Sequence, residues 1–230
     1  MFTLNESSSF KSFEEHLLND QKPSDFFREL VSNDSFPQEK PFNMLGQLMK
    51  TEQNPKFHPE GNVWEHTMQV VDYAAIYNHL SANKRVFMWA SLLHDLGKGT
   101  TTKIRNGKIT SYDHDIAGAR LTKIFLLTFT DDRTFIDDVC KLVRWHMQPL
   151  FITKKLPFSK ISEMMSEVST AEIGLFNLCD RLGRSELSEE NKKIELNNVI
   201  NFLNTCSELS NDIDEKSNIL KIIHHISTLL

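Results

Sequence analysis

The stretch Ala90–Gly99, ASLLHDLGKG, joins the end of an apolar helix to a loop that contains two glycines. It places an imidazole, His94, directly before a carboxylate, Asp95, and a lysine, Lys98, between the two glycines. A polar group on the buried side of a helix is costly unless it finds a partner. We therefore expect the chain to build a functional site where this helix ends.

Most of the remaining sequence has helical periodicity. Apolar side chains and a histidine recur at i, i+3, i+4 and i+7 in Val139, Leu142, Val143 and His146, which is one face of a helix. Ser12, with Glu15 three residues later, is an expected N-cap, as is Ser24. Helices are expected near 12–20, 24–32, 44–50, 63–80, 84–96, 115–130, 133–146, 169–184, 191–209 and 215–230. The predicted fold class is all-α.

One segment departs from this pattern. Asn106-Gly107 lies between alternating residues in KIRNGKIT, a strong signal for a two-residue hairpin turn. We expect a small β-hairpin over 103–111 that projects from the helical body. Its cations, Lys103, Arg105 and Lys108, form the one visibly basic patch of the sequence. We expect the substrate to enter past this hairpin.

The composition is that of an ordinary globular protein. The chain has 230 residues, enough for a sizeable core, and a formal net charge of -5 that gives no general reason to bind nucleic acid. Its three cysteines are far apart and read as reduced thiols. We see no signal peptide and no apolar run long enough to span a bilayer, so we expect a cytoplasmic protein without a membrane partner.

Several predicted helices each direct one polar group toward the interior. These groups lie on apolar faces or at helix ends, and they are His66, His94, Asp95, His114, His146 and Asp180. Imidazole and carboxylate are ligands of divalent transition metals, so one metal centre would satisfy them together. Because adjacent helical residues diverge by about 100°, His94 and Asp95 could share a metal only at a frayed end, which the glycine of LGKG would supply.

Simpler explanations remain open for single residues. A lone histidine on an apolar face is commonly a hydrogen-bonded core residue, and His94-Asp95 alone could be a helix C-cap. We interpret the remaining histidines of the helical segments as structural or surface residues: His16, His79, His224 and His225. GKGT lacks the first glycine of a phosphate-binding P-loop, because position 92 is leucine.

The order His66, His94-Asp95, Asp180 resembles the H…HD…D signature of the HD-domain metal-dependent phosphohydrolases. Five blocks resemble, in sequence, the HD domain of bacterial tRNA nucleotidyltransferases and their stand-alone relatives: HPEGNVWEHTMQVVDYA, ASLLHDLGK, ITSYDHDIAGARL, LVRWHMQP and LCDRLGR. The resemblance implies an HD-type helical bundle. We accordingly divide the chain into an N-terminal helical appendage (1–43), an HD core (44–185) and a C-terminal helical pair packed on the core (186–230). Since residues 1–43 leave no room for a nucleotidyltransferase domain, we expect a stand-alone HD protein.

The resemblance also implies roles for individual residues. His66, His94, Asp95 and Asp180 would bind a first metal, and His114 and His146 a second, with Asp95 as the bridge. Asp95 would also act in catalysis by orienting the attacking water, and Lys98 would contact the scissile phosphate. Arg144 and Arg184, close in sequence to ligands, are further candidates for binding the substrate phosphate.

The sequence thus predicts an enzyme, a metal-dependent phosphatase or phosphodiesterase. Its substrate would be a nucleotide or RNA-end phosphate, such as a 2′,3′-cyclic phosphate. A (deoxy)nucleoside monophosphate phosphatase is the second enzyme hypothesis, and a non-catalytic HD module that binds a nucleotide or a partner is the third. The cofactor would be one or two divalent ions, with iron, manganese, nickel, cobalt, zinc and magnesium suited in varying degrees. A homo-oligomer is compatible with the sequence, but nothing in it indicates one.

Overall fold

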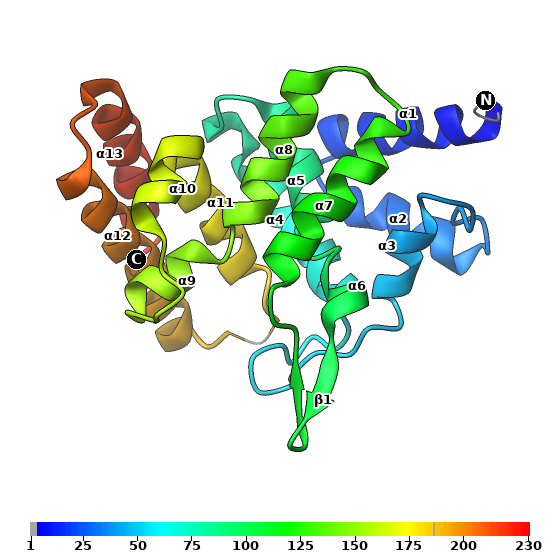
Figure 1. Cartoon of the computed structure of the whole chain (residues 1–230), viewed down its shortest axis with the longest axis horizontal. Coiled ribbons are helices and arrows are strands. Elements are labelled where there is room, and N and C mark those ends of the chain that lie inside the picture. Colours follow the sequence, from blue (N-terminus) through cyan, green and yellow to red (C-terminus); the bar gives the residue numbers. More distant parts are fainter. Residues whose placement is uncertain (1–3, 186) are drawn as a thin grey trace.

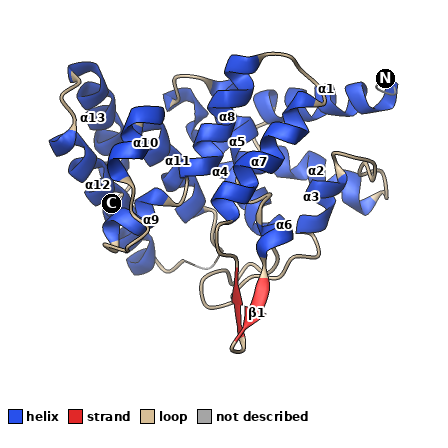
Figure 2. Ribbon diagram, viewed as in Figure 1, coloured by secondary structure: helices blue, strands red, loops and turns tan. Residues whose placement is uncertain are grey.

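The computed structural model describes residues 4–185 and 187–230, and helices dominate this part of the chain (Figures 1 and 2). The helices are α1 (Leu4–Asn19), α2 (Pro23–Ser32), α3 (Asn43–Leu48), α4 (Val63–Tyr77) with the 3-10 turn η1 (Asn78–Leu80), α5 (Lys84–Leu93), α6 (Lys98–Thr101), α7 (His114–Leu127), α8 (Arg133–Trp145), α9 (Gln148–Thr153), α10 (Ile161–Glu167), α11 (Thr170–Leu182), α12 (Glu189–Leu209) and α13 (Ile213–Ser227). The all-α prediction is confirmed.

The centre of the fold is formed by α4, α5 and α11. Helix α5 packs against α4 and α8, and α7 pairs closely with α8 on its outer side (Figure 1). Every residue of α5 from Val86 to Leu93 is buried, and the Trp89 side chain is fully enclosed. Burial of so many large apolar side chains is the main force that holds this helix in place. The end of α5 therefore lies deep inside the protein.

The helix starts follow local capping chemistry. The side chains of Asn62, Asn83, Asp132 and Ser169 each accept a hydrogen bond from a backbone N–H in the first turn of the helix that follows. These caps set the starts of α4, α5, α8 and α11 where the sequence predicts them, within a residue. Helices α4 and α11 carry His66 and Asp180, α5 leads directly to His94 and Asp95, and α8 leads to His146.

Both expected N-caps in the first thirty residues are wrong. Ser12 lies inside α1, which already includes Phe10, because Phe10 and Phe13 face the core at helical spacing. Helix α2 begins at Pro23, whose fixed φ suits the first turn. Ser24 follows inside the helix, and its hydroxyl donates to Asp72 over 2.6 Å.

The hairpin is confirmed. Strands β1 (Lys103–Arg105) and β2 (Lys108–Thr110) pair antiparallel, with Ile104 opposite Ile109. Asn106 and Gly107 both have positive φ, 49° and 72°, as the turn requires. Figure 2 shows the pair projecting from the helical body.

Three short helices were not predicted. They are α6, in the segment expected as a glycine loop, and α9 and α10, between α8 and α11. Each has fewer than eight residues, too few for a periodic apolar pattern. None of the helices in residues 4–185 and 187–230 has the length and apolarity needed to cross a bilayer.

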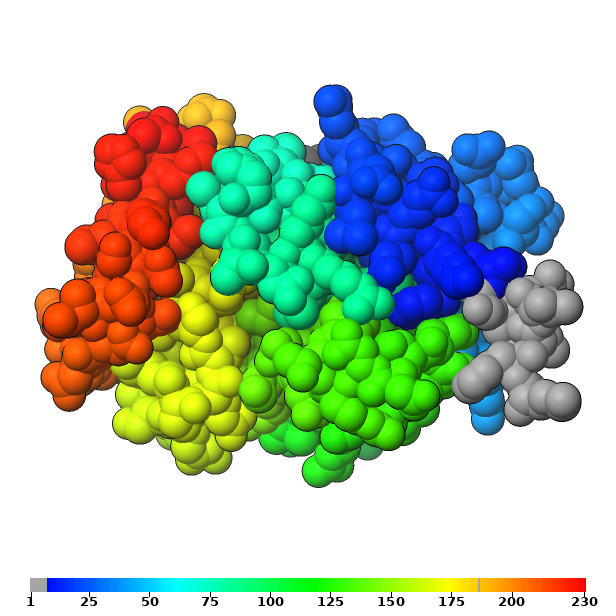
Figure 3. Space-filling view, turned by 90° about the horizontal axis from the view of Figure 1, so that it is seen from above, coloured from blue at the N-terminus to red at the C-terminus, as the bar shows by residue number. Residues whose placement is uncertain are grey.

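The N-terminal and C-terminal helices lie at opposite ends of the molecule (Figure 3). Helices α12 and α13 pack against each other and against α11, whereas α1 and α2 cover α5 and α4. One cluster of buried apolar side chains nevertheless runs from Phe10 to Ile226. The division at residues 43 and 185 remains a proposal.

Candidate metal centre

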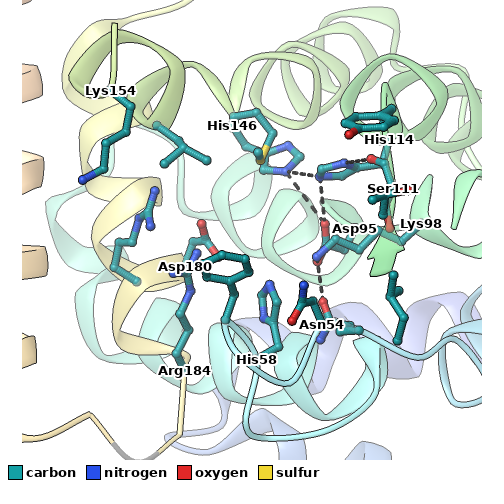
Figure 4. Close-up of a pocket in the computed structure, with 18 of the residues that line it drawn as sticks. Asn54, His58, Asp95, Lys98, Ser111, His114, His146, Lys154, Asp180 and Arg184 are labelled. Carbon is teal, nitrogen blue, oxygen red and sulfur yellow. Dashed lines mark hydrogen bonds and ion pairs between the residues drawn. The ribbon is translucent and has the colours of Figure 1, made fainter. Parts of the chain in front are cut away.

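Figure 4 labels Asp95, His114, His146 and Asp180 at the inner end of α5, and the structure brings six predicted site residues together at this point. Four of them lie at helix ends and two within helices. They are His94 and Asp95 after α5, His114 at the start of α7, His146 after α8, His66 in α4 and Asp180 in α11. All six are at least nine-tenths buried. The fold thus brings together side chains that are up to 114 residues apart, such as His66 and Asp180.

Asp95 lies between two groups of imidazoles. Its Oδ2 atom is 3.3 Å from His94 Nε2 and 3.9 Å from His66 Nε2. Its Oδ1 atom is 3.5 Å from His114 Nε2 and 3.8 Å from His146 Nε2. Each oxygen therefore belongs to a separate set of three ligand atoms that lie within 4.8 Å of one another. This is the arrangement of a carboxylate that bridges two cations.

The histidines present their Nε2 atoms to the centre because their Nδ1 atoms are bonded elsewhere. In each case Nδ1 faces a backbone carbonyl three residues earlier: Ser91 for His94 (3.0 Å), Ser111 for His114 (2.7 Å) and Val143 for His146 (2.7 Å). A carbonyl only accepts, so Nδ1 carries the proton and Nε2 keeps a free lone pair. Metal-ligating histidines are oriented in this way.

The polar atoms at this point fit a cation better than they fit one another. Among the described residues, His94 Nε2 and Asp95 Oδ1 are buried without a hydrogen-bond partner, and Asp95 Oδ2 has an ion pair with Lys98 Nζ. His114 Nε2 and His146 Nε2 lie 3.2 Å apart, so two lone pairs face each other. Burial lowers the pKa of His114 to about 3 and also lowers the pKa of His146, which keeps both imidazoles neutral. A divalent ion on each side of Asp95 would satisfy these atoms.

His66 lies between carboxylates. Its Nε2 is 3.0 Å from Asp180 Oδ1, and its Nδ1 is 3.1 Å from the Gly183 carbonyl and 3.0 Å from Glu60 Oε1. Burial acts to lower the pKa of His66, but the bonds to Asp180 and Glu60 outweigh it and raise that pKa. Burial acts to raise the pKa of Glu60, and hydrogen bonds from His58 and His66 lower it to about 2. A carboxylate behind a ligand histidine fixes its orientation.

Gly97 has a different role from the one expected. Its φ is -64°, an ordinary helical value, so it does not fray the helix end. A Cβ atom at Gly97 would lie 2.0 Å from the carbonyl oxygen of His114, and one at Gly118 would lie 3.3 Å from that of His94. The two glycines allow α7 to approach the end of α5 closely. This contact carries His114 to the centre.

A cavity of about 550 Å³ opens onto the metal centre. Lys98 lines it, and its Nζ lies 2.7 Å from both Asp95 Oδ2 and Gln53 Oε1. Residues Ile109 to Tyr112, at and after the end of the hairpin, line the same cavity. Arg184 also lines it. The cavity can hold an anionic ligand beside Asp95.

Arg144 is placed elsewhere, which corrects the expectation that it faces a substrate. Its guanidinium donates to Asp115 over 2.5 Å and lies over the Trp145 ring. It is absent from the lining of the described cavity. Proximity in sequence to His146 was a poor guide, because neighbours on a helix point in different directions.

Several lining or supporting residues were not predicted, among them Gln53, His58, Glu60 and Arg181. The first three lie in the irregular segment before α4, where no period assigns a side chain to a face. His58 Nδ1 is 2.8 Å from Glu60 Oε1, and burial lowers the pKa of His58 to about 4. The sequence signal that could have pointed to His58 and Glu60 is the block HPEG, which contains both and is part of the resemblance to HD domains.

Fold and site together define an all-helical protein with a buried histidine-aspartate centre suited to divalent metal ions. Residues 63–196 match the HD domain, and the chain belongs to this family. HD domains bind divalent metals and are typically metal-dependent hydrolases.

The chain is also similar to proteins named multifunctional CCA protein. It is 30% identical to that of Thioalkalivibrio sulfidiphilus over 132 residues, which cover 57% of this chain and 30% of the relative. It is 44% identical to that of Cupriavidus metallidurans over 57 residues, or 25% of this chain and 13% of the relative. The chain spans less than a third of the length of these relatives.

Proposed function

We propose that the protein is a metal-dependent phosphohydrolase that acts on nucleotide or RNA-end phosphates, such as 2′,3′-cyclic phosphates. The observation that carries this proposal is the position of Asp95, whose two oxygens face separate pairs of imidazoles. His66, His94, Asp95 and Asp180 would hold one ion, and His114 and His146, with Asp95 as the bridge, would hold a second.

The roles of the side chains follow from their positions. A divalent ion at such a site polarises the phosphoryl group and lowers the pKa of an attacking water. Asp95 Oδ2 would orient that water, with Lys98 Nζ held 2.7 Å away as a fixed cation. Gln53 occupies one donor of the ammonium, which leaves others for a phosphate oxygen. Lys98 would stabilise the charge that develops there as the P–O bond breaks.

The shape of the cavity supports a nucleotide as substrate. About 550 Å³ is within the range of small-molecule sites. Phe57 and Tyr112 line it and are 54% and 60% exposed, so each offers an aromatic face to a base. The likeness to multifunctional CCA proteins favours an RNA end.

Hydrolysis of a substrate panel tests this proposal. The purified protein, with added Mn²⁺, Ni²⁺ or Co²⁺, should open 2′,3′-cyclic AMP faster than it dephosphorylates dAMP. Lys98→Gln should lower kcat by about 100-fold or more with metal content unchanged. Lys84→Gln, at the exposed start of α5, is the matched control. A preference for dAMP would favour the monophosphatase instead, and a protein that binds metal but hydrolyses nothing would be a binding module.

A further inference from the structure

Three cations line the part of the cavity wall next to Asp180. They are Lys154 after α9, Arg181 in α11 and Arg184 just beyond α11, and we call them the basic wall. Figure 4 places Lys154 and Arg184 on one side of the cavity and Lys98 with His114 on the other. The basic wall is therefore separate from the lysine that faces the metal centre.

The charges of the basic wall are poorly compensated. Arg181 is only 7% exposed, and its ion pair with Glu195 is long, at 3.4 Å. The Nε atoms of Arg181 and Arg184 are both buried without a hydrogen-bond partner among the described residues. No ion pair of Arg184 or of Lys154 occurs in the described part of the chain. The nearby anions are Glu195, which pairs with Arg181, and Asp180, whose carboxylate interacts electrostatically with both arginines. Because Asp180 also faces His66, two shared negative charges meet three positive ones.

The unused donors and the excess positive charge of the basic wall favour the binding of an anion. A buried guanidinium with unused donors is costly, and a like charge beside it adds to that cost. Arginine donors suit phosphate, to which they bind in pairs. The open cavity beside all three cations leaves space for a phosphate to meet them.

On the basis of the proposed function, we infer that the basic wall binds a second, non-reacting phosphate of the substrate, so that the preferred substrate is the end of a polynucleotide rather than a mononucleotide. The scissile phosphate would lie at Lys98 and the metal ligands. The preceding phosphodiester would lie at Arg181, Arg184 and Lys154. The exposed rings of Phe57 and Tyr112 offer stacking faces for the bases of the two nucleotides.

Binding of non-hydrolysable ligands tests this inference by calorimetry on the protein as purified. The first ligand is adenosine with a 3′-methylenephosphonate. The second is the same unit preceded by one 2′-O-methyl adenosine through a phosphodiester, and the third carries a 3′-methylenebisphosphonate, with its two charges adjacent. The dinucleotide should bind about tenfold more tightly than the mononucleotide, as expected for one added charge-assisted contact. Equal affinities would overturn the inference, as would a bisphosphonate that binds as tightly as the dinucleotide.

Variants assign the effect to the basic wall. Arg184→Gln and Lys154→Gln should each reduce the advantage of the dinucleotide over the mononucleotide, measured as the ratio of the two affinities for the same variant, to about threefold or less. Lys155→Gln, an exposed neighbour outside the cavity lining, should keep the full advantage. An advantage that survives in both Arg184→Gln and Lys154→Gln would contradict the inference.

The failures of the two proposals can be told apart. If no phosphoester is hydrolysed but the dinucleotide binds more tightly, the second phosphate site stands and the phosphohydrolase does not. If 2′,3′-cyclic AMP is hydrolysed but the two ligands bind equally, the reverse holds. A protein that binds neither ligand would overturn the inference.

Discussion

Asp95 organises the candidate site because each of its oxygens serves a different pair of imidazoles. The four surrounding Nε2 atoms lie 3.3 to 3.9 Å away, too far for good hydrogen bonds but within reach of shared cations. The proton on each Nδ1 is assigned by its acceptor, which for three of the histidines is a nearby backbone carbonyl. For these three histidines, a backbone carbonyl therefore keeps the proton on Nδ1 and directs the Nε2 lone pair toward Asp95.

Removal of one outer histidine should separate the two proposed ions. Of the two oxygens of Asp95, His146 lies near Oδ1, whereas His66 and His94 lie near Oδ2. His146→Asn should therefore lower the metal content by about half and leave the first ion bound. Elemental analysis of the wild type and the variant measures this. An unchanged content would show that His146 is not a ligand, and complete loss would show that the two positions are not separable.

Glu60 should act on metal binding without touching the metal. Its side chain is 1% exposed and lies 3.0 Å from His66 Nδ1, the atom opposite the proposed ligand atom. Glu60→Gln should weaken Mn²⁺ binding by about 10- to 100-fold, as is usual for the partner of a ligand histidine. Glu52→Gln, exposed in the same segment, should have no effect. Equal Mn²⁺ affinity of the wild type and Glu60→Gln in a titration would remove Glu60 from the site.

The sequence predicted side chains on helices better than those in irregular segments. His66, His146 and Asp180 could be assigned to buried faces from their spacing, and the structure brings them together with Asp95. Gln53, His58 and Glu60 could not, because they precede α4 in a segment without a period. Arg144 shows that proximity in sequence to a predicted ligand does not tell where a side chain points, because its guanidinium donates to Asp115 instead.

The crossing of α7 over the end of α5 depends on glycine. Gly97→Ala would place a Cβ 2.0 Å from the carbonyl oxygen of His114, so α7 must move. We expect a loss of roughly 1–3 kcal/mol or more in the free energy of unfolding, together with weaker metal binding.

Gly46→Ala is the matched control for this substitution. Gly46 lies within α3, and a Cβ there meets nothing within 4 Å. The change should stabilise the protein by roughly 0.5–1 kcal/mol. Urea denaturation of both variants measures the difference, and a Gly97→Ala protein as stable as Gly46→Ala would refute the close-packing argument.

Long helices were predictable, whereas of the short helices only α3 was predicted. Helices α4, α5, α7, α8 and α11 to α13 each have ten or more residues, enough for an apolar face to be visible in the sequence. Helices α6, α9 and α10 are held by their neighbours and have no such face. The starts of α1 and α2 were predicted wrongly because other interactions override the local cap signals. Tertiary packing overrides the signal at Ser12 in α1, and Pro23 overrides the signal at Ser24 in α2.

The N-terminal helices are continuous with the core despite their position at one end of the molecule. Phe13 of α1 is 1% exposed and contacts the rings of Phe27 and Phe42. Glu14 Oε2 accepts hydrogen bonds from Arg85 Nε and Trp89 Nε1 of α5. The N-terminal helices therefore contribute to the stability of the central helices as well as to their own.

Phe13→Ala should accordingly destabilise the whole protein. The loss of a buried phenyl ring costs about 3–5 kcal/mol, which is a large part of the stability of a typical domain. Thermal unfolding should remain a single transition at a lower Tm. Phe158→Ala, at a ring that is 59% exposed, should change Tm little. Two transitions in Phe13→Ala, with the larger one unshifted, would show that residues 1–43 fold as a separate appendage.

The account as a whole depends on a metal held by Asp95. The most direct test measures the metal content and the hydrolysis of 2′,3′-cyclic AMP in the wild type and in Asp95→Asn, which preserves the size of the side chain. We predict stoichiometric divalent metal and metal-dependent hydrolysis in the wild type, with both lost in a folded Asp95→Asn. A wild-type protein that retains no metal and gains no activity from added Mn²⁺, Ni²⁺ or Co²⁺ would contradict the central claim.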